Sequence, residues 1–237
     1  MTLKQFLCEY EHMKKKRKLR SWVKWGLAIV LCLAGISWLQ KKDEKDVLIL
    51  QKPEFPNGCE ITSLTMLLQM YGYTPSVALL YDQFLAKGEV TLQDGMLFGP
   101  DPEQAYGGDA RSEDGGWYCY EQPLAQAGNN YLISLGKEAV LVGMQGISIE
   151  QLDELVNQGP VVCWVTIGFE APLYSTLVWN TGVMTYQSLR NLHCLVVRAK
   201  TIDGYAVLDP LRGSYTVEEM VFQNSFASVG SRVVYMQ

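Results

Sequence analysis

The 237-residue sequence has only two histidines and no Cys-x-x-Cys pair. Structural zinc sites are commonly built from closely spaced cysteines together with histidines, so the sequence predicts no metal site and no cofactor. It also has no Gly-rich phosphate loop and no internal repeat, which argues against a nucleotide site and a repeat fold. His12 lies in a basic N-terminal segment, so His193 is the one candidate for imidazole chemistry in the rest of the chain.

Positive charge is scarce outside the first 46 residues. The net charge of residues 1–46 is +6, whereas that of residues 47–237 is −11. Binding to nucleic acid depends on Lys and Arg side chains that neutralise phosphates, so we expect no nucleic-acid partner for the acidic part. A basic end joined to an acidic body is also found in proteins with a membrane anchor.

An uncharged apolar run, WGLAIVLCLAGISWL, occupies residues 25–39. With the four residues before it, the run approaches the length of about 20 residues that spans a bilayer core. Trp22, Trp25 and Trp38 match an interfacial aromatic belt, and the preceding Lys and Arg residues predict a cytoplasmic N-terminus. A cleaved signal peptide remains the alternative, because the run also fits the apolar region of such a peptide.

The sequence therefore predicts four parts: a cytoplasmic basic segment (1–20), a transmembrane signal-anchor (21–39), a linker (40–46) and a folded domain (47–237). In that domain, apolar residues at helical spacing predict a helix from about Cys59, with Asn57 as its N-cap and Gly72 at its end. Ser148 and Gln151 match a capping box. Helices dominate the first part and strands the second, which indicates an α+β fold with a largely antiparallel sheet. Further segments predict strands at 47–50, 161–167, 192–198, 205–208 and 232–236, and a long surface loop at 94–116.

Four residues form a pattern that suits nucleophilic cysteine chemistry. Cys59 lies at the start of the predicted helix, where the positive end of the helix dipole favours a thiolate. His193 lies in a predicted strand and could act as the base, while Asp209 at the end of the next strand could orient the imidazole. Gln51 lies upstream of the cysteine, where its side-chain amide could bind an oxyanion together with the Cys59 N–H group.

The hairpin between the two strands provides a geometric test. For His193 and Asp209 to face each other directly, the hairpin must be centred on Thr201, with a loop of three to five residues closed by Gly204. A two-residue turn at Asp203-Gly204 would instead pair Asp209 with Arg198 and separate the two side chains.

Four blocks of the sequence resemble the stand-alone C39-like papain-fold cysteine peptidases of Gram-positive bacteria, which are related to bacteriocin-leader peptidase domains. The blocks are PNGCEITSLTMLLQMYG, GPVVCWV, LHCLVVRAKTIDGYAVLDPLRGSY and FQNSFASVGSRVVYM. The resemblance covers nearly all of residues 47–237 and implies a papain-like fold. It assigns Cys59 as nucleophile, His193 as base, Asp209 as orienting acid and Gln51 as oxyanion residue. The sequence departs from the family where Arg198-Ala199-Lys200 replaces a Gly-Tyr-Asp-like turn.

The resulting hypothesis is a membrane-anchored cysteine peptidase that acts outside the cell on a peptide or protein substrate. Two alternatives stay open, because all four residue types are present. One is a catalytically inactive papain-fold binding module at the cell surface. The other is an amidase or acyltransferase that acts on cell-wall peptides. Cys119, Cys163 and Cys194 could form disulfides outside the cell, but the apolar surroundings of Cys163 and Cys194 favour free buried thiols.

Overall fold

The computed structural model describes residues 47–237, so the predicted segments 1–20, 21–39 and 40–46 lie outside the described residues. Within residues 47–237, no helix has both the length and the apolar character of a membrane span. The helices are α3 (Cys59–Met70), α4 (Val77–Gln83), α5 (Glu121–Ser134), α6 (Ile149–Gln158) and α7 (Glu219–Ser228), with a short 3-10 turn η1 (Ile167–Phe169). The strands are β1 (Lys87–Gly88), β2 (Thr91–Gln93), β3 (Met96–Phe98), β4 (Tyr106–Gly107), β5 (Leu141–Met144), β6 (Val161–Thr166), β7 (Tyr174–Asn180), β8 (Thr185–Leu189), β9 (Leu192–Thr201), β10 (Gly204–Asp209), β11 (Gly213–Val217) and β12 (Val233–Met236).

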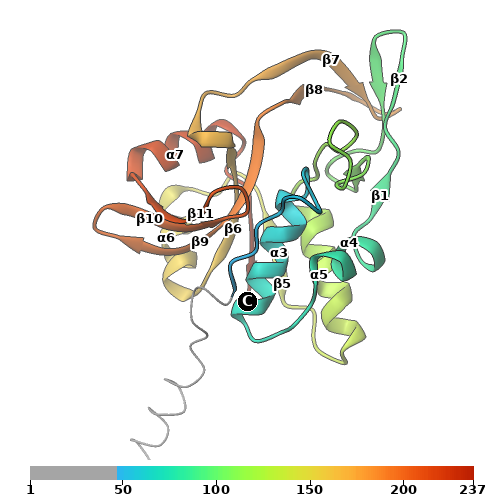
Figure 1. Ribbon diagram of the computed structural model, residues 1–237. Helices are drawn as coiled ribbons and strands as arrows, with labels where there is room; N and C mark the ends of the chain where they lie inside the picture. The colour runs from blue at the N-terminus through green and yellow to red at the C-terminus, as the bar shows by residue number, and fades with distance from the viewer. Residues whose placement is uncertain (1–46) are drawn as a thin grey trace, which may run out of the picture. The chain divides into compact units, whose positions relative to one another are not determined.

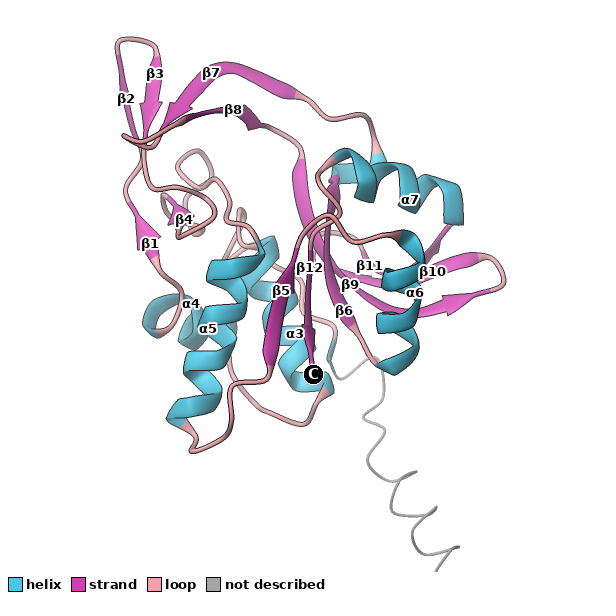
Figure 2. Cartoon of the chain, turned by 180° about the vertical axis from the view of Figure 1, so that it is seen from behind, coloured by secondary structure: helices cyan, strands magenta, loops and turns pink. Residues whose placement is uncertain are grey.

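A six-stranded antiparallel sheet forms the centre of the domain. Its strand order is β11-β10-β9-β6-β12-β5. Helices α3 and α5 lie on one face and α6 and α7 on the other (Figures 1 and 2). A sheet covered on both faces needs apolar side chains on both sides, and β6 and β10 are accordingly buried along their whole length. The predicted α+β class with a largely antiparallel sheet is confirmed.

Alternate residues of the strands supply two separate cores. In β6, Val162 and Trp164 pack with the α3 and α5 side, whereas Val161, Cys163 and Val165 pack with α6 and α7. This alternation follows from the two-residue period of a β-strand.

Helix α3 is the most deeply buried helix of the first core. Every residue from Cys59 to Leu68 is buried, and the Ser63 hydroxyl donates to the Cys194 carbonyl at 3.1 Å. Gly72 has a φ of +86° and follows the C-cap residue, so the predicted helix end is confirmed. The N-terminal end of α3 is therefore held at a fixed position beside β9.

A second, four-stranded sheet extends from the first, with the order β2-β3-β7-β8. Strands β7 and β8 run side by side across the top of the view in Figure 1 toward β2. β3 and β7 pair in parallel although about eighty positions separate them in the sequence. This arm carries residues that line the cleft described below.

Several local predictions need correction. Residues 47–50 form no strand, because their backbone pairs with no neighbouring strand. The N-cap of α3 is Gly58, and the Asn57 side chain instead donates to the carbonyls of Ser112 and Glu113. The predicted surface loop at 94–116 contains β3 and β4 and buries Tyr106.

Candidate active site

The first residue of α3 is Cys59, whose side chain faces a cleft. The turn before it is tight, since a Cβ on Gly58 would lie 2.7 Å from the Cβ of Phe55. Only glycine fits there without displacing the loop. Cys59 is 9% exposed, and its thiol donates to Glu60 Oε2 at 3.2 Å.

The surroundings of this thiol favour its protonated form. Burial raises the pKa of Cys59 well above its usual value, the negative charge of Glu60 raises it further, and the backbone N–H of Cys194 opposes both effects. These surroundings oppose the thiolate that the sequence predicts at the start of the helix. In the described part of the chain, the thiol is hydrogen-bonded to Glu60 and not to His193.

His193 and Asp209 form a buried pair beside the cleft, which His193 lines. The His193 Nε2 and Asp209 Oδ1 atoms are 2.8 Å apart, and both side chains are 3% exposed. Asp209 also accepts from the Tyr215 hydroxyl at 2.6 Å and from the Leu211 N–H group at 2.7 Å. The contact that the sequence predicted between His193 and Asp209 is present.

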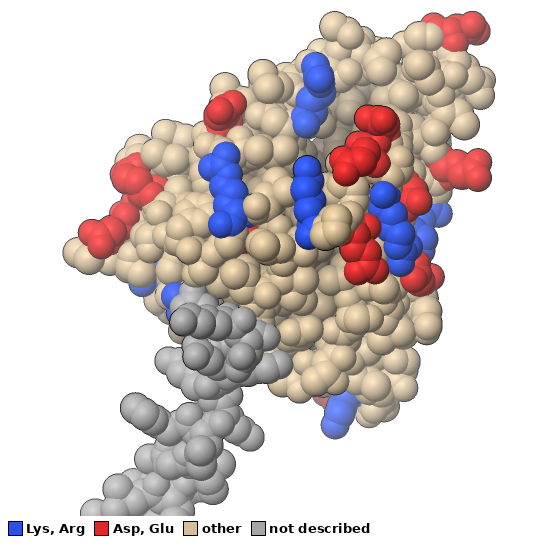
Figure 3. Space-filling model, viewed as in Figure 1, with Lys and Arg blue, Asp and Glu red and all other residues tan. Residues whose placement is uncertain are grey.

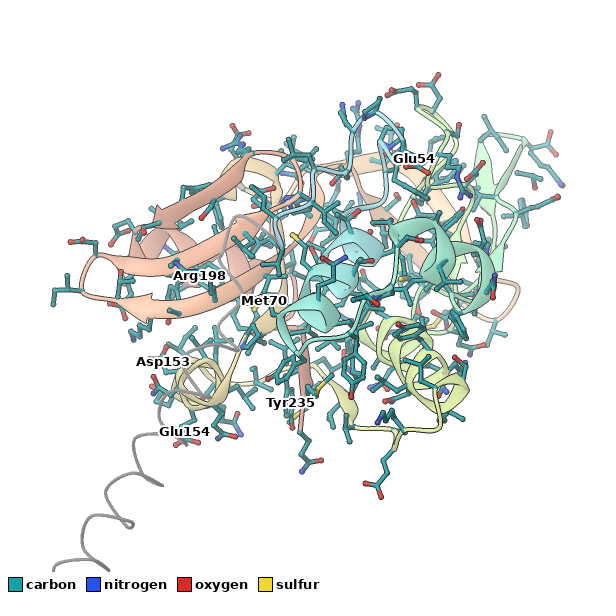
Figure 4. All side chains as sticks on the ribbon, turned by 60° about the horizontal axis from the view of Figure 1, so that its bottom comes forward. Glu54, Met70, Asp153, Glu154, Arg198 and Tyr235 are labelled. Carbon is teal, nitrogen blue, oxygen red and sulfur yellow. The ribbon has the colours of Figure 1, made fainter. Side chains whose placement is uncertain are left out.

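The hairpin that brings these residues together differs from the predicted one. Gly204 pairs with Thr201, so the turn consists of Ile202 and Asp203 and is shorter than the predicted loop. The register shifts by one residue between Ala206 and Val207: Ala206 pairs with Ala199 and Val207 with Val197, so the ladder to β10 skips Arg198 of β9. Figure 4 labels Arg198 on this strand.

This bulge decides which face Asp209 occupies. Beyond it, Val207 pairs with Val197 and Leu208 with Val196, and one further step places Asp209 opposite Leu195. Leu195 and His193 are two positions apart and share a face, so Asp209 is a diagonal neighbour of His193. Diagonal neighbours are within reach of long side chains. The requirement for direct pairing was therefore too strict. If Arg198 instead paired with Val207, Asp209 would lie opposite Val196, and the side chains of Asp209 and His193 would be on opposite faces.

Gln51 connects the two sides of the candidate site. Its backbone N–H donates to the carbonyl of Pro210, next to Asp209, and its side-chain Nε2 donates to the carbonyl of Pro56 at 2.6 Å, just before α3. The side chain is 4% exposed, and its Oε1 atom has no hydrogen-bond partner among residues 47–237. One hydrogen of the amide is thus engaged by the protein, and the other is available to a ligand.

A single cleft of about 380 Å³ brings Gln51, Cys59 and His193 together. Its walls include Trp117 and Tyr118 from the segment before α5 and residues of the arm. Figure 3 shows that basic and acidic side chains are interspersed on the face seen in Figure 1. The remaining lining residues are Pro56, Asn57, Leu97, Glu113, Asp114, Gly116, Ile167, Ser175, Leu177, Ser188, Leu189, Arg190, Leu192 and Leu211.

Two neighbours of these residues were not singled out from the sequence. The Tyr215 hydroxyl on β11 donates a hydrogen bond to Asp209. The only sign of this role in the sequence was the position of Tyr215 two strands after His193. Glu60 directly follows Cys59, and a carboxylate beside a candidate nucleophile in an otherwise uncharged helix was a visible signal. Cys119, Cys163 and Cys194 are buried free thiols.

Residues 36–234 match the model of the Peptidase_C39 like family. The uncharacterized protein YvpB of Bacillus subtilis (strain 168) is 25% identical over 190 residues, which cover 79% of this chain and 72% of that protein. The crystal structure of a candidate C39-like peptidase from Bacillus anthracis superimposes with a TM-score of 0.67 at 29% identity. That similarity covers 79% of this chain and 92% of the other.

Proposed function

Because the chain belongs to the Peptidase_C39 like family, we propose that residues 47–237 form a thiol peptidase domain in which Cys59, His193 and Asp209 act as a catalytic triad. The observation that carries this proposal is the His193–Asp209 pair on the cleft that Cys59 also lines. A nucleophile, a base and a group that orients the base are the parts that covalent acyl transfer requires. The substrate class is a peptide or an unfolded protein segment.

In the proposed reaction, the Cys59 sulfur attacks a peptide carbonyl after its proton has passed to His193. The imidazolium then protonates the leaving amine, and the C–N bond breaks to leave a thioester. His193 next takes a proton from water, which attacks the thioester and restores the thiol. Because Asp209 binds Nε2, Nδ1 is the ring nitrogen assigned to these proton transfers.

Gln51 and the Cys59 N–H group are assigned to the oxyanion of the tetrahedral intermediate. The bond from Gln51 Nε2 to Pro56 limits rotation of the amide, so its second hydrogen keeps a fixed direction. Donors held in place before the reaction stabilise developing charge without reorganisation.

The first test compares the full-length protein with its Cys59→Ala variant. Peptide products formed from denatured casein are identified by mass spectrometry. We expect turnover to fall by about 10⁴-fold or more, because loss of a nucleophile removes the covalent route. The matched control is Cys163→Ala, which removes a buried thiol of β6 that does not line the cleft and packs in the core on the side of α6 and α7.

Thermal unfolding followed by circular dichroism shows whether each variant is folded. If folded Cys59→Ala retains turnover, the assignment of the nucleophile is wrong. If the wild-type protein itself forms no products from casein or from a peptide library, the domain is better explained as a binding module.

We further propose that residues 21–39 anchor the protein in the membrane and that the peptidase domain lies outside the cell. The basic segment and the uncharged run of the sequence support this proposal. Adding trypsin to intact cells should digest residues 47–237, whereas a cytoplasmic marker protein stays intact. Protection of the domain in intact cells, with digestion after lysis, would contradict the proposal.

A further inference from the structure

Glu60 is a buried carboxylate in an unusual position. It is 1% exposed, its Oε2 accepts from the Cys59 thiol at 3.2 Å, and its Oε1 accepts from the Cys119 N–H group at 3.2 Å. Within residues 47–237 it forms no ion pair with a Lys, Arg or His side chain. The other buried glutamate, Glu121, pairs with Arg232. A buried carboxylate without a cation is costly, so a role at the neighbouring thiol is the explanation that we pursue.

We propose that Glu60 holds the Cys59 thiol in a protonated resting state and thereby sets the pH range in which the nucleophile reacts. Glu60 is in this sense a positioning residue, because it acts through Cys59 and not on the substrate. The proposal rests on the proposed peptidase function only in taking Cys59 as the nucleophile.

The two charge states of Glu60 have opposite effects on the thiol. An ionised Glu60 accepts a hydrogen bond from the thiol and repels a negative charge on the sulfur, so the S–H bond is kept. A protonated Glu60 is neutral, and the repulsion disappears. The thiol proton can then pass to His193, with the S–H bond broken and an N–H bond formed, which leaves a thiolate beside an imidazolium.

The surroundings place this change near neutral pH. Burial raises the pKa of Glu60 to about 7, although hydrogen bonds from its own N–H, Cys59 and Cys119 oppose the rise. The titratable groups that face it from other elements are Tyr106 of β4, Tyr118 and Cys119 before α5, and Cys194 of β9.

Burial raises the pKa of each of these four groups above its usual value. They therefore stay neutral between pH 5 and pH 9. Glu60 is then the group in this cluster whose charge changes in that range.

The test measures the rate at which iodoacetamide alkylates Cys59 in the full-length protein between pH 5.5 and pH 9.5. Mass spectrometry of the Cys59 peptide separates this reaction from those of the other cysteines. For the wild-type protein we expect a rate that falls about tenfold from pH 6 to pH 8 and rises again above pH 9. A hydrogen bond to a charged group contributes about the free energy that corresponds to a tenfold change in rate.

Glu60→Gln should abolish the decrease in the alkylation rate between pH 6 and pH 8. The Cys59 thiol of the variant should then react about tenfold faster than that of the wild type at pH 8, and equally fast below pH 6. The control is Glu113→Gln, which removes a carboxylate from the same cleft without a contact to the thiol, and which should keep the wild-type profile.

Two results would overturn the inference. One is a wild-type rate that rises steadily with pH, as for a simple thiol. The other is a Glu60→Gln variant that differs from the wild type by the same factor at every pH, which would mean a purely structural role. If Glu60→Gln does not fold, as judged by circular dichroism, the wild-type profile alone decides. Alkylation requires no turnover, so this experiment can succeed or fail independently of the casein assay.

Discussion

Asp209 accepts three hydrogen bonds, and these determine its charge. Burial alone would raise its pKa, but the bonds from His193, Tyr215 and the Leu211 N–H group outweigh burial and lower it to about 2. Because the folded pKa lies below the usual value near 4, Asp209 stabilises the fold above about pH 4. That contribution is lost as the pH falls toward 2. The carboxylate is therefore ionised at every pH at which His193 could take part in catalysis.

Tyr215→Phe tests the support that Asp209 receives from β11. The substitution removes the 2.6 Å hydrogen bond to Asp209 Oδ2 and leaves that buried oxygen without this donor. We expect a loss of about 1.5–3 kcal/mol in the free energy of unfolding. We also expect a threefold to tenfold lower kcat with an unchanged KM, because a less constrained Asp209 orients His193 less well. Urea unfolding and peptide turnover measure the two effects.

Tyr205→Phe is the matched control for Tyr215→Phe. The Tyr205 hydroxyl donates to Asp153 on α6 at 2.7 Å and lies away from the cleft lining. It should lose stability with no change in kcat. If Tyr215→Phe behaves in the same way, Tyr215 has no part in positioning His193.

The β9–β10 hairpin is the element on which the candidate site depends most. Its outer end is fixed to α6 and α7, because Lys200 pairs with Asp153 and, at 3.0 Å, with Glu219. Figure 4 labels Asp153 and Glu154 on α6 and Arg198 on β9. The one-residue bulge at Arg198 then turns the inner end, so that Asp209 faces the same side as His193.

The sequence predicted the two strands of this hairpin but not their register. Apolar residues on both sides of β9 and β10 fit either face, so alternation does not show which residue is left out of the ladder. Glu60 was visible beside Cys59 in the sequence, but its burial and the hydrogen bond that it accepts from the Cys119 N–H group, about sixty positions away, were not predictable. The start of α3, its end at Gly72 and the capping box at Ser148 were predictable because their causes are local.

Deletion of Arg198 tests the register of the hairpin directly. Without the extra residue, Val207 should still pair with Val197 in a continuous ladder, and Asp209 should still lie opposite Leu195. We therefore expect the deletion variant to keep the contact between His193 and Asp209, the downfield proton resonance of the His193 Nε2–H group and most of the turnover. Arg198→Ala keeps the number of residues and should keep the bulge together with the same contact.

Loss of the resonance in a folded deletion variant would contradict this register, because it would mean that removal of one residue from β9 separates His193 from Asp209. Circular dichroism distinguishes such a shift in register from general unfolding.

At the scale of the whole domain, the cleft requires that the helical layer with α3 and α5 stays fixed to the sheet. Arg232, directly before β12, bonds Glu121 at the start of α5 at 2.6 Å and Glu103 at 2.7 Å. Its guanidinium also lies 3.7 Å from the centre of the Tyr120 ring. These contacts join a strand of the central sheet to the segment that carries Trp117 and Tyr118 on the cleft wall.

Arg232→Met should therefore destabilise the whole domain. Glu121 is 1% exposed, so loss of its cation leaves a buried charge unpaired, and we expect a cost of about 3–5 kcal/mol in urea unfolding. The double variant Arg232→Met, Glu121→Gln removes that charge as well and should be more stable than the single variant. Arg111→Met is the control, because its bridge to Asp82 is largely exposed and contributes no more than about 1 kcal/mol. Equal losses for Arg232→Met and Arg111→Met would mean that the buried pair does not hold the two layers together.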